Sequence, residues 1–353
     1  ICVIIRLHTL SRRSRVMATI KDVANRAGVS IAAVSYYLNG KTEHVRADTA
    51  ERIQNAVDEL NYTRSPIARS LATGRSHMVG VLVCGSSPYG IEGMLIMGIA
   101  EGFLASEYQI IIKPALDAKY RAQYPARVLP KHVDGAIIIG PLNSNDPNLG
   151  NIYHKQEPGK PMIVMEDVSD DWGVTRVNAD NYQCGRLIAE EIVRKGHKSI
   201  SVLYRGGLSL STERRLDGIL DVCRENSIRM PPEMIRDLPD CDREDCVNII
   251  ADLIKSPHKP TALISIHGGF IFLISDAVKI AGVKVGEDLD VGFADYSIPF
   301  DYRLEWPITL LKIDEYEIGV TAARTFLEML KDSSYKSEDK YFLPEILTLK
   351  PKA

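Results

Sequence analysis

The stretch TIKDVANRAGVSIAAVSYYLNG, residues 19–40, has the pattern of two short helices joined by a tight turn. Thr19 and Asp22 form the hydroxyl–carboxylate pair of a capping box, which starts a helix by bonding its first backbone amides. Small and apolar side chains then recur at helical spacing until Gly28, which supplies the turn. Ser30 is placed to cap the second helix. The stretch therefore predicts a helix-turn-helix unit.

The residues after this unit extend it into a small all-α head. Residues 48–60 predict a third amphipathic helix, so we expect one domain over residues 17–63. PIARSLA, residues 66–72, then predicts one short helix with proline at its start. A helix of seven residues is unstable alone in water, so residues 64–77 are expected to act as a hinge that orders only when packed or bound.

Charge is distributed unevenly along the chain. Residues 1–75 carry a net charge of +6 and the remaining 278 residues carry −9, which points to a polyanion partner for the head alone. Residues 1–16 hold four arginines and no acid, and we expect them to be upstream sequence or a disordered arm before a start at Met17. They lack the long apolar core of a secretory signal, and no apolar run approaches the ~18–20 residues of a membrane helix.

Cysteine usage and motif searches argue against several classes of protein. The six cysteines are scattered without CxxC spacing, which predicts reduced thiols and neither a disulfide framework nor a zinc site. A Rossmann-like enzyme is one alternative, but no GxGxxG follows a strand and no P-loop, GxSxG or HExxH occurs. An exported solute-binding protein is another, although it would need a signal peptide. We therefore expect a non-enzyme without cofactor or metal.

Strands and helices alternate from residue 78 onward, which predicts an α/β body with parallel sheets. The expected strands are 78–83, 109–113, 136–139, 162–165, 201–204, 263–266 and 290–293. The expected helices are 95–104, 182–194, 213–224 and 270–280.

Residues 17–79, with TIKDVANRAGVS, AVSYYLNG, RIQNAVDELNY and ARSLATGRSHMVGVL, resemble the DNA-binding head and hinge of the LacI/GalR family of bacterial transcription regulators. The similarity continues less strictly over nearly the whole remaining chain. It implies that residues 78–353 form a periplasmic-binding-protein-like body, with lobe 1 at about 78–178 and 306–340 and lobe 2 at about 179–305.

The resemblance also implies a function. It implies a cytoplasmic, nucleoid-associated regulator, more commonly a repressor than an activator, that binds a palindromic DNA operator as a homodimer or tetramer. A small-molecule effector, in most members a sugar or a similar molecule, would bind between the lobes and control it.

The resemblance assigns bases and phosphates to particular residues of the head. The second helix would lie in the major groove, where Ile31 and Ala32 suit thymine methyls and Tyr36 offers a hydroxyl. The alternative is that Ile31 and Ala32 only fill the helix surface. The residues placed to bond phosphates or to lie near the DNA are Thr19, Ser30, Ser35, Asn39, His44 and Arg69.

Leu71 is the apolar residue of the hinge with the most specific implied role. The resemblance makes it a wedge between base steps in the minor groove, beside the same residue of a second subunit. Such a wedge unstacks and bends the duplex, a cost that the extra contacts offset. The alternative is an ordinary packing leucine.

The resemblance also places an effector site at the carboxyl ends of the strands of the body. The residues that it assigns are Ser87 and Tyr89 after the first strand, Asp167, Arg215 of the Arg-Leu-x-Gly motif, His267 and Asp295. A surface salt bridge is the alternative for Arg215, a hydrogen-bonded residue of ordinary kind is the alternative for His267, and Asp180 is expected to be a helix cap.

Three departures from the family pattern fall in this site. His267-Gly268 stands where many members have Asn-Asp, and Ala294-Asp295 stands where two acids are usual. Asp167 replaces an arginine. Because sugar recognition depends on polar side chains matched to hydroxyls, these changes argue against an ordinary sugar effector.

Overall fold

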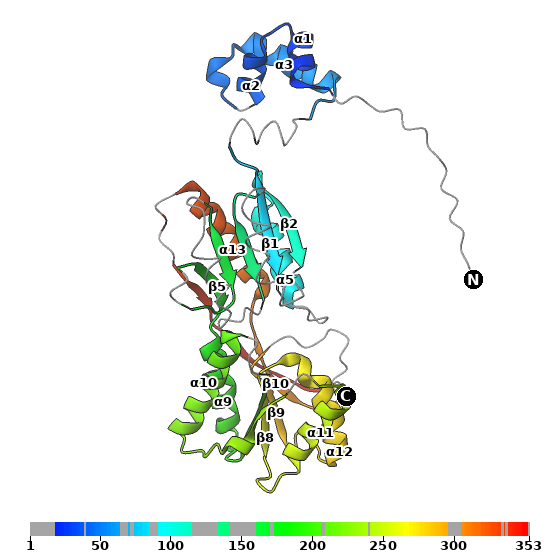
Figure 1. Cartoon of the computed structure of the whole chain (residues 1–353), viewed down its shortest axis with the longest axis vertical. Coiled ribbons are helices and arrows are strands. Elements are labelled where there is room, and N and C mark those ends of the chain that lie inside the picture. The colour runs from blue at the N-terminus through cyan, green and yellow to red at the C-terminus, as the bar shows by residue number, and fades with distance from the viewer. Residues whose placement is uncertain are drawn as a thin grey trace, which may run out of the picture. The chain divides into compact units, whose positions relative to one another are not determined.

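The computed structural model separates the chain into two compact units, residues 1–76 and 77–353. The residues that it describes are 18–38, 40–63, 70, 74–84, 91–114, 133–140, 160–169, 173–205, 209–238, 241–295, 305–332, 335 and 338–351. Figure 1 shows a helical first unit and an α/β second unit. None of the helices in the described ranges is both long enough and apolar enough to span a membrane.

The first unit confirms the expected helix-turn-helix and its capping. Its described elements are α1 (Ile20–Ala27), α2 (Ile31–Leu38), the 3-10 turn η1 (Thr42–His44) and α3 (Ala47–Glu59). The Thr19 hydroxyl accepts the Asp22 amide at 3.3 Å, and the Asp22 carboxylate accepts the Thr19 amide at 2.8 Å. Gly28 ends α1 at φ 64°, a conformation that other residues rarely adopt.

The core of the head takes one fully buried side chain from each helix. Val23 of α1, Val34 of α2 and Ile53 of α3 all have 0% exposure. Ala24 and Ala27 of α1 and Ala56 of α3 are buried beside them, so each helix buries one apolar face and leaves its other faces available for contacts outside the unit.

The second unit consists of two lobes, each built on a six-stranded sheet (Figure 1). The first lobe contains β1 (Met78–Val83), α5 (Ile91–Phe103), β2 (Gln109–Pro114), β3 (Ala136–Ile139), β4 (Met162–Met165), β5 (Thr175–Ala179), α13 (Glu315–Lys331) and β11 (Lys340–Phe342). Its strand order is β11-β5-β4-β3-β1-β2, with parallel pairing throughout.

The second lobe repeats this plan with one antiparallel strand. Its helices are α9 (Asn181–Arg194), α10 (Leu210–Glu225), α11 (Arg243–Ile254) and α12 (Ile271–Ala281), with 3-10 turns η3 (Pro232–Met234) and η4 (Gly268–Phe270). Its strands are β6 (Ile200–Tyr204), β7 (Ile235–Asp237), β8 (Ala262–Ser265), β9 (Asp290–Phe293), β10 (Ile308–Lys312) and β12 (Glu345–Leu349). The strand order is β12-β10-β9-β8-β6-β7, and only β12 runs antiparallel to its neighbour.

Both faces of the second sheet are covered by helices. Val202 of β6 and Ile264 of β8 belong to the apolar cluster with α9 and α10. Their chain neighbours Leu203 and Leu263 belong to the cluster with α11 and α12. This alternation is the period-two geometry of a strand, and it explains the continuous apolar runs in the sequence.

The path of the chain between the lobes differs from the expectation in one place. The sequence predicted a return to the first lobe at about residue 306, but β10 pairs with β9 in the second sheet. The chain therefore returns only after Lys312, and β12 goes back to the second lobe through its pairing with β10. Five strands were not predicted, namely β5, β7, β10, β11 and β12, since they are short, partly polar or at the sheet edge.

Glycines allow the paired helices of each lobe to approach closely. A Cβ at Gly98 of α5 would lie 2.0 Å from the carbonyl oxygen of Tyr316 on α13. A Cβ at Gly185 of α9 would lie 1.9 Å from the carbonyl oxygen of Arg215 on α10. Both distances are far inside van der Waals contact, so these helices pack backbone against backbone.

We expect Gly98→Ala to destabilise the body by about 1–3 kcal/mol, because α5 and α13 must move apart to admit the methyl group. Gly93→Ala on the same helix is the matched control, since no atom lies within 4 Å of its added Cβ. Alanine there should be neutral or stabilising by ~0.5–1 kcal/mol. Chemical denaturation of both variants measures the difference, and equal stabilities would contradict the close packing.

Candidate functional sites

The second helix of the head presents its predicted contact residues to solvent. Ile31 is 48% exposed and Tyr36 is 44% exposed, and Ala32 is exposed beside them. Val34, on the opposite face, is fully buried. Ser35 is half-buried between the two faces. An exposed apolar and aromatic surface on a short helix is a site for a partner to cover.

A tilted ring contact connects this helix to the following turn. The rings of Tyr36 and His44 lie 5.1 Å apart between centroids at an angle of 43°. His44 is exposed and lies 3.5 Å from the carboxylate of Glu43. Two residues assigned separately from the sequence thus form one aromatic surface beside α2.

Two of the expected phosphate contacts also act as helix caps. The Ser30 hydroxyl accepts the Ala33 amide at 3.2 Å. The Thr19 hydroxyl donates to Asp22 at 2.7 Å in addition to its capping bond. Both side chains are exposed, so a phosphate would share these hydroxyls with the caps.

Several predicted residues lie outside the part of the chain that the structure describes. They are Asn39, Arg69, Leu71, Ser87, Tyr89 and the arm of residues 1–16.

In the body, polar residues of both lobes meet at the carboxyl ends of the strands. Asp167 follows β4 in the first lobe and is fully buried. Its Oδ2 accepts from Asn181 Nδ2 at 2.8 Å and from the Ser211 hydroxyl at 3.1 Å, and both of these residues belong to the second lobe. These bonds join the lobes through a buried carboxylate.

Arg215 continues the network within the second lobe. Its Nε donates to Asn181 Oδ1 at 2.7 Å and its Nη1 to the Ile266 carbonyl at 3.3 Å. Its Nη1 also lies 3.7 Å from Asp295 Oδ2. Gly185 makes this position possible, because any side chain there would push the backbone of Arg215 away from α9.

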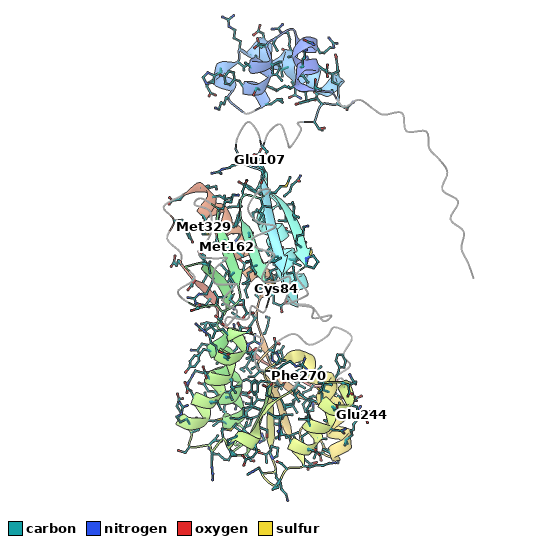
Figure 2. The ribbon with its side chains drawn as sticks, in the orientation of Figure 1. Cys84, Glu107, Met162, Glu244, Phe270 and Met329 are labelled. Atoms are coloured by element: carbon teal, nitrogen blue, oxygen red, sulfur yellow. The ribbon has the colours of Figure 1, made fainter. Side chains whose placement is uncertain are left out.

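Asp295 and His267 complete the network at the ends of β9 and β8. Asp295 accepts the Gly268 amide at 3.0 Å. The His267 ring lies 5.2 Å from the ring of Phe270, which Figure 2 labels in the second lobe. Burial lowers the pKa of His267 to about 4, against an opposing effect of Asp295, so the ring is neutral at pH 7.

Glu166 lies next to Asp167 and also contacts the Ser211 hydroxyl. Burial raises the pKa of this carboxyl to about 7; the charge of Asp167 adds to the rise, while Ser211 and Arg215 oppose it. A carboxyl with this pKa is partly protonated at neutral pH and can donate as well as accept a hydrogen bond.

We call Glu166, Asp167, Asn181, Ser211, Arg215, His267 and Asp295 the interlobe cluster. It brings together four predicted residues, Asp167, Arg215, His267 and Asp295. The sequence assigned no site role to Glu166, Asn181 or Ser211, although Asn181 directly follows the expected helix cap Asp180. Asp180 is a helix cap, as expected, and accepts the Gln183 amide at 3.0 Å. Across the described residues, no group of three or more acidic, histidine or cysteine side chains could hold a metal.

Family models match both units of the chain. Residues 19–65 match "Bacterial regulatory proteins, lacI family", and residues 95–334 match "Periplasmic binding proteins and sugar binding domain of LacI family". The second match alone covers more than half of the chain. The chain belongs to the LacI family of bacterial regulatory proteins. It is therefore a DNA-binding transcription regulator with an effector-binding domain, and not an enzyme.

Individual relatives of this LacI-family chain align over nearly its whole length. An "HTH-type transcriptional repressor PurR" of Aliivibrio salmonicida (strain LFI1238) is 26% identical over 95% of the chain and 98% of that protein. The lac repressor dimer bound to operator and the anti-inducer ONPF has a TM-score of 0.78 at 23% identity, with 94% and 97% of the two chains covered. A transcriptional regulator CelR–cellobiose complex has a TM-score of 0.67 at 18% identity, with 95% and 100% covered.

We expect Glu166→Gln to change how stability depends on pH. The folded state holds the Glu166 proton up to a pKa of about 7, while the unfolded chain releases it near 4.5. Unfolding free energy should therefore fall as pH rises through this window, by on the order of 3 kcal/mol at ~1.4 kcal/mol per pKa unit. Glutamine removes this contribution.

The comparison must be between variants because His267 acts in the opposite direction. Its lowered pKa makes stability rise as pH increases from about 4 towards the ordinary histidine pKa of 6.5. Urea denaturation of the unchanged chain and of Glu166→Gln from pH 5 to 8 isolates Glu166, and Glu213→Gln on the exposed side of α10 is the matched control. Parallel pH profiles for all three would contradict a buried protonated Glu166.

Proposed function

We propose that this LacI-family regulator is a cytoplasmic, nucleoid-associated repressor that binds a near-palindromic operator as a homodimer. Its affinity for DNA changes when a small molecule binds at the interlobe cluster. The cluster carries the proposal, since it joins the two lobes through the buried Asp167 carboxylate and second-lobe donors. A ligand that competes for these donors would change how the lobes are held.

The head supports DNA reading by α2. Tyr36 offers a hydroxyl and Ile31 an apolar surface on the exposed side of this helix, as a major-groove contact requires. In the hinge, Leu71 is proposed to contact the minor groove and Arg69 the DNA phosphates. Around α2, the residues proposed to contact the DNA phosphates or to lie near them are Thr19, Ser30, Ser35, Asn39 and His44. Repression is the activity named for the PurR relative.

An apolar stripe on the first lobe supports the dimer. Met94 is 43% exposed and Met97 is 60% exposed, one helical turn apart on α5, and Leu104 just beyond it is 76% exposed. The adjacent side of α5 packs on α13 through Gly98 and Gly102. Exposed apolar stripes of this kind mark protein interfaces, and a second copy of the chain would place two heads on one operator.

Effector control follows from the same two lobes. Asp167 is in the first lobe, and its partners Asn181 and Ser211 are in the second. A ligand held by Arg215, His267 and Asp295 at this junction, with Ser87 and Tyr89 proposed as further contacts, would favour one arrangement of the lobes. In a dimer, that arrangement sets the distance between the two hinges and so the affinity for the operator.

We expect Tyr36→Ala to weaken operator binding by about tenfold or more, because a specific base contact contributes ~1–3 kcal/mol. Asn55→Ala is the control, since Asn55 is exposed on α3 of the same head. Titration with an operator selected from genomic fragments and with unrelated DNA measures the ratio. An equal loss on both DNAs would assign Tyr36 to the phosphates instead of the bases.

We expect Met97→Glu to dissociate the dimer, because each subunit would bring a carboxylate into the apolar interface. Sedimentation velocity should then report a monomer, with operator affinity reduced in parallel. Leu343→Glu, at another exposed apolar position away from α5, is the matched control. A Met97→Glu dimer as stable as the control would place the interface elsewhere.

A further inference from the structure

Two cysteine side chains meet at the start of α11 in the second lobe. This helix begins at Arg243, and Asp242 caps it by accepting the Asp245 amide at 2.9 Å. Cys241 lies directly before the cap, and Cys246 is the fourth residue of the helix. These are the two positions at which side chains pack across a helix N-terminus as a hydrophobic staple. The backbone of the cap therefore brings Cys241 and Cys246 together.

Hydrogen bonds show that the two side chains are in contact. The Cys246 thiol donates to the Cys241 carbonyl oxygen, with 3.9 Å between the sulfur and the oxygen. The thiols of Cys241 and Cys246 also form a hydrogen bond with each other. The Cys246 amide donates to the Asp242 carbonyl at 3.2 Å, which holds the backbone in the first turn of the helix. Rotation of the two side chains can thus form a disulfide with little movement of the backbone.

Exposure separates this pair from the other cysteines of the described ranges. Cys241 alone among them is partly exposed, while Cys246 is 2% exposed. Cys84, Cys184 and Cys223 are at most 1% exposed. Burial raises the pKa of Cys184 to about 12 and that of Cys223 to about 11, which keeps them protonated and unreactive. A reagent in solution therefore reaches Cys241 first.

We propose that Cys241 and Cys246 form a reversible oxidation site, at which a small-molecule disulfide converts the two thiols into an intramolecular disulfide. The Cys241 thiolate attacks one sulfur of the reagent, so a mixed disulfide forms and one reagent thiolate leaves. The Cys246 thiolate then attacks the Cys241 sulfur, and the second reagent thiolate leaves. The chain loses two electrons and two protons, and the reagent takes them up as two thiols. The site is separate from the interlobe cluster and from the head.

The surroundings of Cys241 set the speed of this exchange. The hydrogen bond with Cys246 is the main cause that raises the pKa of the Cys241 thiol, and burial and the carboxylates of Asp245 and Asp242 add to the rise. Because the thiolate is the attacking species, exchange is slow at neutral pH and becomes about tenfold faster between pH 7 and 8. A thiol of high pKa is also a poor leaving group, so the bridge resists reduction once it has formed.

The test treats the reduced full-length protein with excess oxidised glutathione at pH 8. The remaining thiols are then alkylated in urea, and the chain is digested with trypsin and analysed by mass spectrometry. Trypsin cleaves after Arg243, between the two cysteines, so the bridge would join peptide 237–243 to peptide 244–255. We expect this linked pair as the main product, with Cys84, Cys184 and Cys223 alkylated. Dithiothreitol should separate the two peptides again.

Single variants test the order of the two steps. Cys246→Ser should stop at a glutathione mixed disulfide on Cys241, because no second thiol is left to attack it. Cys241→Ser should leave Cys246 unmodified, because its side chain is buried. Cys2→Ser is the matched control and should still give the linked pair.

Three results would overturn the site. The first is an unchanged native chain that gives no linked pair under conditions in which the chain in urea forms it. The second is a mixed disulfide that persists on Cys241 of the unchanged chain, since two sulfurs in contact would resolve it. The third is modification of Cys84, Cys184 or Cys223 to the same extent as the pair. The peptide map of the unchanged chain decides all three without a variant.

Discussion

The buried hydrogen bonds of Asp167 join the two lobes of the body. A carboxylate that is fully buried needs donors, and here Asn181 and Ser211 of the other lobe supply them. Asn181 in turn orients Arg215, whose guanidinium reaches the ends of β8 and β9 through Ile266 and Asp295. How the two lobes are held together thus depends on a few polar atoms at one junction. A regulator controlled by a ligand needs such an arrangement.

Burial also decides the protonation of the groups around this junction. The same loss of solvent raises the pKa of Glu166 to about 7 and lowers that of His267 to about 4, so both groups tend towards their neutral forms. Asp167 is next to Glu166 and has direct donors from Asn181 and Ser211. The cluster therefore limits its own buried charge.

Prediction from the sequence succeeded where the signal was local. The capping box of Thr19 and Asp22 and the turn at Gly28 were both predicted from adjacent residues, because they depend on the backbone of one turn. It was weaker where partners were distant. From the sequence, β10 was expected to belong to the segment that returns to the first lobe. Only its pairing with β9 assigns it to the second lobe. Ser211 has no local signal at all, since its role comes from contacts to Glu166 and Asp167 more than forty residues away.

The sequence by itself determined the class of the protein: a basic helix-turn-helix head, an α/β body and the polar residues at the strand ends. These follow from periodicity, capping and motif order, which act over a few residues. Only the tertiary structure decided which of those polar residues share hydrogen bonds and which carboxyl is partly protonated at neutral pH. Those properties depend on burial and on groups brought together from separate strands and helices, and a linear pattern does not contain these distances.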